Sequence, residues 1–358
     1  MYALCLDIGT SSLKGAVISS AGKLVSDGRI LYKEGVVWQQ ALGELVQKLD
    51  RTFSISAVAV SGNGPTFIPI KNDGTIGSPL FWNEKKELPL AAGQSLYLPK
   101  LMWLKKNCPQ EYESTKLLLT MDGYFNWLLT GAAAAPVYDD RFVPFFWNRE
   151  DAEKNGIDIE KLPPFVHTGE KIGVVTEGAE KQFGVKKGTP VFAGGSDFLM
   201  AILGTATLEK GQICDRAGTS EGINYCCEAE KKIENSELRI MPHITEGCIN
   251  ISVRLSESAH LIEHDREQYG RSLCRALQVL EQEGCTAEAL RLSGGQAKNA
   301  EWNQLRANMT GKRVLVPEIA DGELAGCACA AFSGLGLYES PAQAAEAIVR
   351  IAREYIPE

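Results

Sequence analysis

An internal repeat constrains the fold most strongly: a strand, a Gly-Thr-Ser turn and a second strand occur twice. The first copy, "DIGTS" at 7–11, lies between apolar stretches at 3–6 and 16–18. The second copy, "DRAGTS" at 215–220, is likewise flanked by apolar strand-like residues. Self-similarity at two distant places indicates duplicated structural units. The sequence therefore predicts two related domains that face each other.

Hydrophobic periodicity predicts strands and helices in alternation along the chain. Strands are expected at 2–8, 13–19, 24–31 and 56–60, and helices at 37–49, 99–107 and 121–130. Residues 131–165 are expected to be irregular, and 188–204 to form a strand, a glycine turn and a helix. Residues 290–318 predict strand, glycine turn, helix and strand, and the tail from 340 an amphipathic helix. Such alternation is typical of an α/β protein.

Composition excludes several classes of partner. The 358 residues carry a formal charge of −8, which argues against broad binding to nucleic acid or anionic membranes. Ten cysteines form no CxxC pair, so we expect reduced thiols in a cytoplasmic protein. No signal peptide and no apolar segment long enough to span a bilayer is expected.

The first Gly-Thr-Ser loop has the chemistry of a phosphate site. Its glycine allows a tight turn whose N–H groups cradle an anion, and its hydroxyls and lysine add donors. These residues are Gly9, Thr10, Ser11, Ser12 and Lys14. Asp7 offers a carboxylate to Mg²⁺ or to its waters. A plain hairpin turn is the alternative for this loop alone, and the spacing is not that of a Walker loop.

The second loop, with Gly218, Thr219 and Ser220, favours phosphate binding because a phosphate chain is gripped from two sides. Asp197, in "AGGSDFLMAILG", lies between the two loops in sequence. It is either a helix N-cap or the carboxylate that orients and deprotonates an attacking hydroxyl, and the two roles are compatible.

Two further groups have local alternatives. Gly294 and Gly295 follow a strand and would let a flat base approach the backbone, with Asn299 near the base or ribose; alone they indicate a tight turn. His260 and His264 are four residues apart on an expected helix. A solvated helix surface explains them better than a metal site, because no third ligand is evident.

In combination these motifs resemble the FGGY family of carbohydrate kinases, xylulokinase-like members above all. The matching stretches include "DIGTSSLKGAVI", "VAVSGNGPTFIPIKNDG", "PLFWNE", "LPKLMWLKKN", "LLTG", "GTPVFAGGSDFLMAILG", "GTSEGIN" and "LSGGQAKNAEWNQLRANMTGKRVLVP". Their order and spacing are more specific than any one of them.

The resemblance implies two actin-like (ribonuclease H-type) domains, here 1–195 and a shortened 196–358, with a nucleotide/sugar cleft between them. It implies ATP and Mg²⁺, with Asp197 as general base and, with Asp7, near the metal. The adenosine would lie at Gly295 and Asn299. The sugar would lie near Asn63, Gly64, Pro65, Thr66, Trp82, Glu84, Asp197 and Phe198.

Departures from the family pattern concentrate at sugar-recognition positions. The family's WxDxR is "WNEKK", which places Glu84 and Lys86 where Asp and Arg are usual. The usual Thr-Asp pair after "LLTG" is Ala135-Pro136, and Phe198 replaces a small polar residue. A Gly-Glu-Arg-Thr-Pro-like loop is missing, so the chain is a compact member.

The leading hypothesis is therefore ATP-dependent phosphorylation of a small sugar or polyol, a ketose such as a pentulose being favoured. We expect a cytoplasmic monomer or homodimer that binds neither nucleic acid nor membrane. The alternatives are a non-catalytic sugar or nucleotide sensor on a kinase core, and an actin-like ATPase that activates a partner protein.

Overall fold

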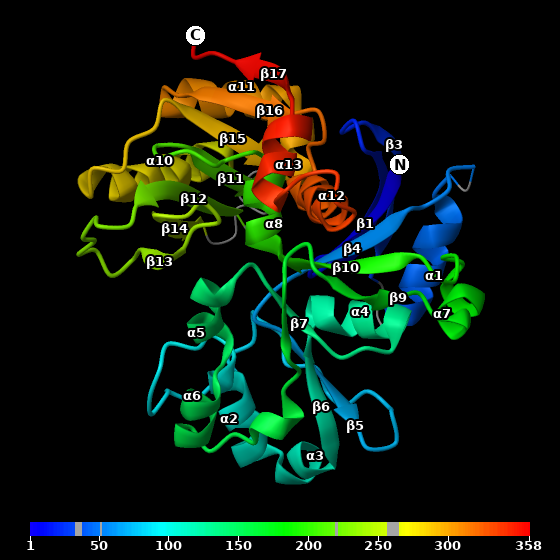
Figure 1. Ribbon diagram of the computed structural model, residues 1–358. Coiled ribbons are helices and arrows are strands. Elements are labelled where there is room, and N and C mark those ends of the chain that lie inside the picture. Colours follow the sequence, from blue (N-terminus) through cyan, green and yellow to red (C-terminus); the bar gives the residue numbers. More distant parts are fainter. Residues whose placement is uncertain (33–37, 51, 219–220, 256–264) are drawn as a thin grey trace. The chain divides into compact units, whose positions relative to one another are not determined.

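The computed structural model describes residues 1–32, 38–50, 52–218, 221–255 and 265–358 (Figure 1). The chain divides into two compact units, each with its own sheet. Unit 1 comprises residues 1–18, 25–197 and 330–336, and unit 2 comprises 19–24, 198–329 and 337–358. Within the described ranges, no helix has the length and apolar composition needed to cross a lipid bilayer.

Unit 1 is built on a six-stranded sheet with the order β3-β2-β1-β4-β10-β9. The strands are β1 (Tyr2–Ile8), β2 (Ser12–Ser19), β3 (Leu24–Leu31), β4 (Ala57–Gly62), β9 (Lys171–Val174) and β10 (Pro190–Ser196). Strands β1, β4 and β10 are parallel neighbours and are almost entirely buried, as expected for near-continuous apolar runs. Helices α1 (Trp38–Lys48), α4 (Met121–Thr130) and α7 (Glu177–Phe183) contribute to the core on this sheet.

The rest of unit 1 consists of short elements. They are β5 (Phe67–Lys71), α2 (Leu98–Asn107), α3 (Pro109–Ser114), β6 (Thr115–Thr120), β7 (Ala135–Val137), η1 (Asp140–Phe142), α5 (Val143–Phe146), α6 (Arg149–Lys154), η2 (Ile159–Lys161) and β8 (Phe165–His167). Irregular structure throughout 131–165 is thus a wrong expectation. Side-chain caps such as Asn148, which accepts from the Asp151 N–H, stabilise helical turns too short to show apolar periodicity.

Unit 2 has a seven-stranded sheet with the order β13-β14-β12-β11-β15-β16-β17. Its elements are α8 (Asp197–Gly204), β11 (Ile213–Ala217), β12 (Glu221–Glu228), β13 (Arg239–Pro242), β14 (Cys248–Leu255), α10 (Arg266–Gln282), β15 (Ala289–Ser293), η3 (Gly295–Lys298), α11 (Ala300–Thr310), β16 (Arg313–Pro317), α12 (Gly322–Gly334), α13 (Pro341–Ile348) and β17 (Ile351–Tyr355). The tail is therefore only partly helical. Residues after α13 pair antiparallel with β16, which satisfies backbone groups that a helix would otherwise satisfy internally.

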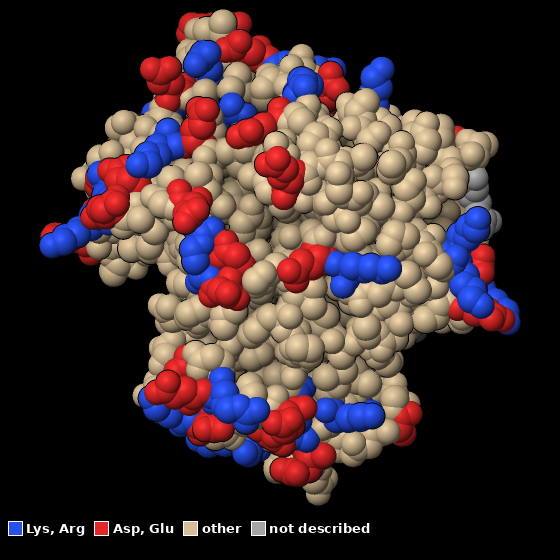
Figure 2. Space-filling model, in the orientation of Figure 1, with Lys and Arg blue, Asp and Glu red and all other residues tan. Residues whose placement is uncertain are grey.

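Two helices of unit 2 approach each other backbone to backbone. A Cβ added at Gly204 of α8 would lie 1.8 Å from the Gly322 carbonyl oxygen, and one at Gly326 of α12 would lie 2.1 Å from the Met200 carbonyl oxygen. Any larger side chain there would push the helices apart, so glycine is required. All ten cysteines are free thiols, as expected. Figure 2 shows acidic and basic side chains intermixed on the displayed face, without a broad basic surface there.

A fully buried ion cluster lies between the sheet and helices of unit 2. The Arg306 guanidinium on α11 is 3.7 Å from Asp215 on β11 and 3.7 Å from Glu221 on β12, and all three side chains are 0% exposed. Its Nε also donates to the Tyr269 hydroxyl at 2.9 Å, and that hydroxyl donates to Glu221 at 2.8 Å. Burial, and then the charge of Glu221, raise the pKa of the Asp215 carboxyl well above its ordinary value. Arg306 is thus the counter-charge for two buried acids.

Replacing Arg306 by Met should lower the free energy of unfolding by about 3–5 kcal/mol, because it leaves Asp215 and Glu221 without a counter-charge. Urea unfolding followed by circular dichroism measures this. Arg313→Met is the matched control: Arg313 is half-exposed and pairs with Glu354 at the surface, so its loss should cost less than about 1 kcal/mol. Equal costs for the two substitutions would contradict the assigned role of Arg306.

Candidate active site

The carboxyl ends of three parallel strands in unit 1 bring several predicted site residues together. Asp7 in β1 pairs in register with Ser61 in β4, and Ser196 in β10 pairs with Gly62 in β4. Asp197 follows β10 directly as the first residue of α8. Because parallel strands end at the same edge of a sheet, Asp7 and Asp197 flank the end of β4. Open α/β sheets bind ligands at such edges.

The first Gly-Thr-Ser loop is a tight turn at this edge. The Gly9 N–H donates to the Ser12 carbonyl at 3.0 Å, and a Cβ on Gly9 would press on that same oxygen at 3.2 Å. Thr10 and Ser11 are exposed, whereas Ser12 is buried and accepts from Arg29 Nε at 2.9 Å. Lys14 Nζ lies 3.6 Å from the Asp7 carboxylate. The loop thus presents hydroxyls to solvent on a rigid base.

The oxygen groups near Asp7 fit a hydrated Mg²⁺ bound with a nucleotide. The Tyr32 hydroxyl is buried without a hydrogen-bond partner among the described residues, and burial together with the Asp7 charge raises its pKa. The Ser61 hydroxyl, in register with Asp7, is also unpartnered within the described ranges. No cluster of three or more His, Cys, Asp or Glu that could hold a metal occurs in the described part of the chain. One carboxylate with nearby hydroxyl oxygens suits Mg²⁺, which keeps waters and takes phosphate oxygens as ligands.

The predicted sugar segment forms a chain of hydrogen bonds. The Thr66 hydroxyl donates to Asn63 Oδ1 at 2.9 Å and accepts from the Trp82 backbone N–H at 3.2 Å. The Gly64–Pro65 peptide bond is cis, and a Cβ on Gly64 would lie 2.7 Å from the Tyr97 hydroxyl oxygen. Asn63 and Thr66 are buried. The chain of bonds therefore fixes the positions of Asn63 and Trp82 relative to each other.

Glu84 and Lys86, which stand where the family has Asp and Arg, form a local ion pair. Lys86 Nζ lies 3.3 Å from the Glu84 carboxylate, which also accepts from the Phe81 N–H at 3.3 Å. The pair is about one-third exposed and closes the turn that carries Trp82. A sugar contact through Glu84 stays a prediction.

Asp122 is a site residue that the sequence did not reveal. It lies in the first turn of α4, is buried, and interacts electrostatically with Asp197. Burial, and to a smaller extent the Asp197 charge, raise the pKa of Asp122 to about 6. Burial, and then the charges of Asp122 and Asp197, raise the pKa of the Tyr97 hydroxyl well above its ordinary value. An acid in the first turn of a helix is so common that its sequence carried no signal.

The position of Asp197 depends on a bulge in β10. The register of β10 on β4 shifts between Ala193 and Gly195, and a Cβ on Gly194 would lie 2.1 Å from the Val60 carbonyl oxygen. The Thr168 hydroxyl donates to the Gly194 carbonyl at 2.7 Å. Bulges next to active sites commonly re-aim a side chain. Phe198, the next residue, is half-buried.

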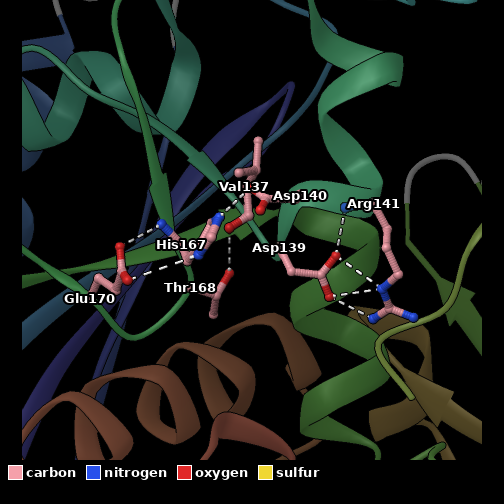
Figure 3. A network of polar contacts seen from close by, with 7 residues as sticks. All are labelled: Val137, Asp139, Asp140, Arg141, His167, Thr168 and Glu170. Carbon is pink, nitrogen blue, oxygen red and sulfur yellow. Dashed lines mark hydrogen bonds and ion pairs between the residues drawn. The ribbon is translucent and has the colours of Figure 1, made fainter. Parts of the chain in front are cut away.

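Polar side chains after β7 hold each other in a second network (Figure 3). Arg141 forms a bidentate pair with Asp139 through Nε and Nη2. His167 Nε2 lies 2.9 Å from Asp140 Oδ1, and its backbone N–H donates to Glu170 at 3.1 Å. The two acids that follow the Ala135-Pro136 departure are thus engaged with neighbouring side chains.

The predicted adenosine residues lie in unit 2, around the ends of β11 and β15. Gly294 adopts φ +103°, and a Cβ there would lie 2.6 Å from the Ala217 carbonyl oxygen, so the two strand ends touch. Gln296 Nε2 donates to the Gly218 carbonyl at 2.9 Å. Asn299 caps α11 by accepting from the Trp302 N–H.

Four residues that the sequence singled out lie outside the described ranges. They are Thr219, Ser220, His260 and His264.

Comparison with known proteins agrees with this fold and site. Residues 78–204 match the FGGY family of carbohydrate kinases, N-terminal domain, and residues 271–335 match its C-terminal domain. The autoinducer-2 kinase of Enterobacter sp. (strain 638) is 23% identical over 487 aligned positions, covering 99% of this chain and 90% of that protein. The alignment is longer than the 358-residue chain, so the relative carries segments that this compact chain lacks.

Solved structures show the same architecture. Xylulose kinase from Lactobacillus acidophilus has a TM-score of 0.76 at 16% identity, and Plasmodium falciparum glycerol kinase with ADP has 0.75 at 12%. Each covers all of this chain and 94% of its own. The fold is thus the actin-like ATPase fold of sugar kinases.

The chain belongs to the FGGY family of carbohydrate kinases, since the two family matches together span more than half of it. It is a kinase that phosphorylates sugars with ATP, and FGGY kinases generally use Mg²⁺.

Asp122→Asn should remove a pH-dependent component of stability. With a folded-state pKa of about 6, Asp122 keeps its proton in the folded protein and loses it in the unfolded chain between about pH 4 and 6. The wild-type free energy of unfolding should therefore fall as the pH rises through 6, by about 3 kcal/mol from this group.

Urea unfolding at pH 4 to 8 measures the effect as the difference between wild type and Asp122→Asn. Asp27→Asn, on exposed β3, is the control and should retain the wild-type component. A difference that does not change with pH would show that Asp122 ionises alike in both states.

Proposed function

We propose that this kinase transfers the γ-phosphoryl group of ATP to a hydroxyl of a small uncharged sugar or polyol, a ketose such as a pentulose being favoured, with Asp197 as general base. The observation that carries the proposal is the pair of carboxylates at one sheet edge, Asp7 near the end of β1 and Asp197 directly after the parallel strand β10. One acid serves the metal–phosphate side, and the other accepts the proton of the attacking hydroxyl.

Asp197 has the features a general base needs. It is partly exposed, so a substrate reaches its carboxylate, and the start of α8 stabilises its negative charge. Burial, and to a smaller extent the charge of Asp197, raise the pKa of the neighbouring Asp122 carboxyl to about 6. Mg²⁺ would supply charge neutralisation at the phosphate, held near Asp7 largely through water.

The predicted nucleotide-binding residues are part of the same proposal. The phosphates would contact the loop of Gly9 and Thr10 and that of Gly218, Thr219 and Ser220, and the adenosine would lie against Gly294, Gly295 and Asn299. A monomer or homodimer, and domains of 1–195 and 196–358, stay predictions.

An uncharged acceptor suits the residues predicted to contact the sugar. Asn63 and the Trp82 indole are neutral hydrogen-bonding groups, and the carboxyls of Asp122 and Asp197 would repel a sugar acid. The kinases to which this chain is similar suggest xylulose, glycerol and autoinducer-2 as candidate acceptors. We favour a ketose, in line with the xylulokinase-like motifs.

ADP release from Mg-ATP should be stimulated by at least one acceptor in a panel of pentuloses, hexuloses, aldoses, polyols and autoinducer-2. A sugar acid such as gluconate should stimulate it least, because carboxylates line the proposed site. Asp197→Asn should lower the stimulated rate by about 10²–10⁴-fold, since it removes the proton acceptor. A coupled assay for ADP measures both rates.

Asp27→Asn is the control and should turn over at the wild-type rate. Acceptor-independent ADP release that Asp197→Asn abolishes would instead support an ATPase that acts on a partner protein. Nucleotide binding without ADP release for any acceptor would contradict this proposal and support a sensor.

A further inference from the structure

Trp82 joins the predicted sugar segment to the predicted phosphate loop. Its indole Nε1 donates to the Thr10 hydroxyl at 3.0 Å, across 72 residues of sequence. Its backbone N–H donates to Thr66, whose hydroxyl donates to Asn63. One residue is therefore bonded through its side chain to one predicted subsite and through its backbone to the other.

The turn that carries Trp82 is fixed by a buried ammonium group. Lys100 Nζ donates to the carbonyl oxygens of Phe81 at 2.8 Å and Glu84 at 3.1 Å. The Lys100 residue is only 1% exposed, and burial lowers the pKa of its ammonium group. Carbonyl groups that flank Trp82 on both sides thus offset the loss of water around this cation. Since Glu84 N–H also donates to the Phe81 carbonyl, residues 81–84 form a closed turn on Lys100.

Thr10 is otherwise weakly held. It is exposed and follows the buried strand β1, and among the described residues its side chain is hydrogen-bonded to Trp82 alone. A hydroxyl in a turn has several rotamers, and a bond from a fixed indole restricts them. The position of the Thr10 hydroxyl therefore depends on the position of the turn at Lys100.

We propose that Trp82 is a positioning residue that orients Thr10 for the nucleotide phosphates, so that nucleotide affinity depends on the sugar segment. The inference rests on the proposed role of the 9–14 loop in phosphate binding. Lys100 supports it at a distance: it contacts the turn of Trp82, and acts on Thr10 only through that turn.

Binding of Mg²⁺ with the β,γ-imido analogue of ATP, measured by calorimetry without sugar, tests the proposal. Trp82→Phe keeps the ring but removes the donor, and Thr10→Val removes the acceptor. Trp82→Phe should weaken binding about two- to tenfold, the value of one neutral hydrogen bond, and Thr10→Val, which also removes the hydroxyl proposed to face the phosphates, should weaken it at least as much. The double variant should bind about as weakly as whichever single variant has the lower affinity, because both changes remove the same bond. Thr10→Ser, which keeps the hydroxyl, should bind more tightly than Thr10→Val.

Lys100→Met should also weaken nucleotide binding, and should do so much less when Trp82 is already Phe. Lys105→Met, on the same helix, and Trp103→Phe, a tryptophan next to the Lys86 side chain, are the matched controls and should bind like wild type. If the Lys100→Met variant does not fold, the double-mutant cycle of Trp82→Phe and Thr10→Val still tests the proposal. Additive losses in that cycle, or wild-type binding by Trp82→Phe, would overturn the proposal.

These binding measurements do not involve an acceptor sugar. If no acceptor is phosphorylated while the cycle is non-additive, the proposed function fails and the positioning role of Trp82 stands. If sugars are phosphorylated while the losses in the cycle are additive, the proposed function stands and the positioning role of Trp82 fails.

Discussion

Parallel pairing of β1, β4 and β10 is the constraint on which the candidate site depends. Each strand is nearly all buried, so its register on the next is held by the core rather than by surface contacts. The pairing of Asp7 with Ser61 and of Ser196 with Gly62 then fixes where each strand ends. Residues more than a hundred positions apart in sequence reach the same edge for this reason.

Three acidic residues, Asp7, Asp122 and Asp197, belong to the candidate site, and each has a different environment. Asp7 has Lys14 nearby, Asp122 is buried so that its pKa rises to about 6, and Asp197 lies partly exposed at a helix start. Burial contributes most to the raised pKa of Asp122, and the neighbouring charge of Asp197 adds to it. In unit 2, by contrast, the positive charge of Arg306 lies against two fully buried acids.

Local pattern was enough to predict most elements of the sheet. Strands β1 to β4 and helices α1, α2 and α4 were expected within a residue or two, because apolar runs and helical spacing are strong there. The actin-like fold of a sugar kinase was also correctly predicted, from the order of the motifs rather than from any single one.

What the sequence did not reveal depends on tertiary contacts. Strand β17 pairs only because β16 offers an edge, and short helices in 131–165 rely on caps. Asp122, Lys100 and Arg306 look like ordinary helix residues, since their importance comes from burial among groups distant in sequence. The Trp82–Thr10 hydrogen bond likewise could not be predicted from the sequence, because it depends on the turn that Lys100 stabilises.

The most direct test of the central claim is a crystal structure with Mg²⁺, a non-hydrolysable ATP analogue and the best acceptor from the panel. Our account predicts one acceptor hydroxyl within hydrogen-bond distance of Asp197, about 3 Å, and facing the terminal phosphate. It also predicts that Asp7 lies next to the metal or to its waters. An acceptor whose hydroxyls all lie beyond reach of Asp197, or a terminal phosphate far from this sheet edge, would contradict it.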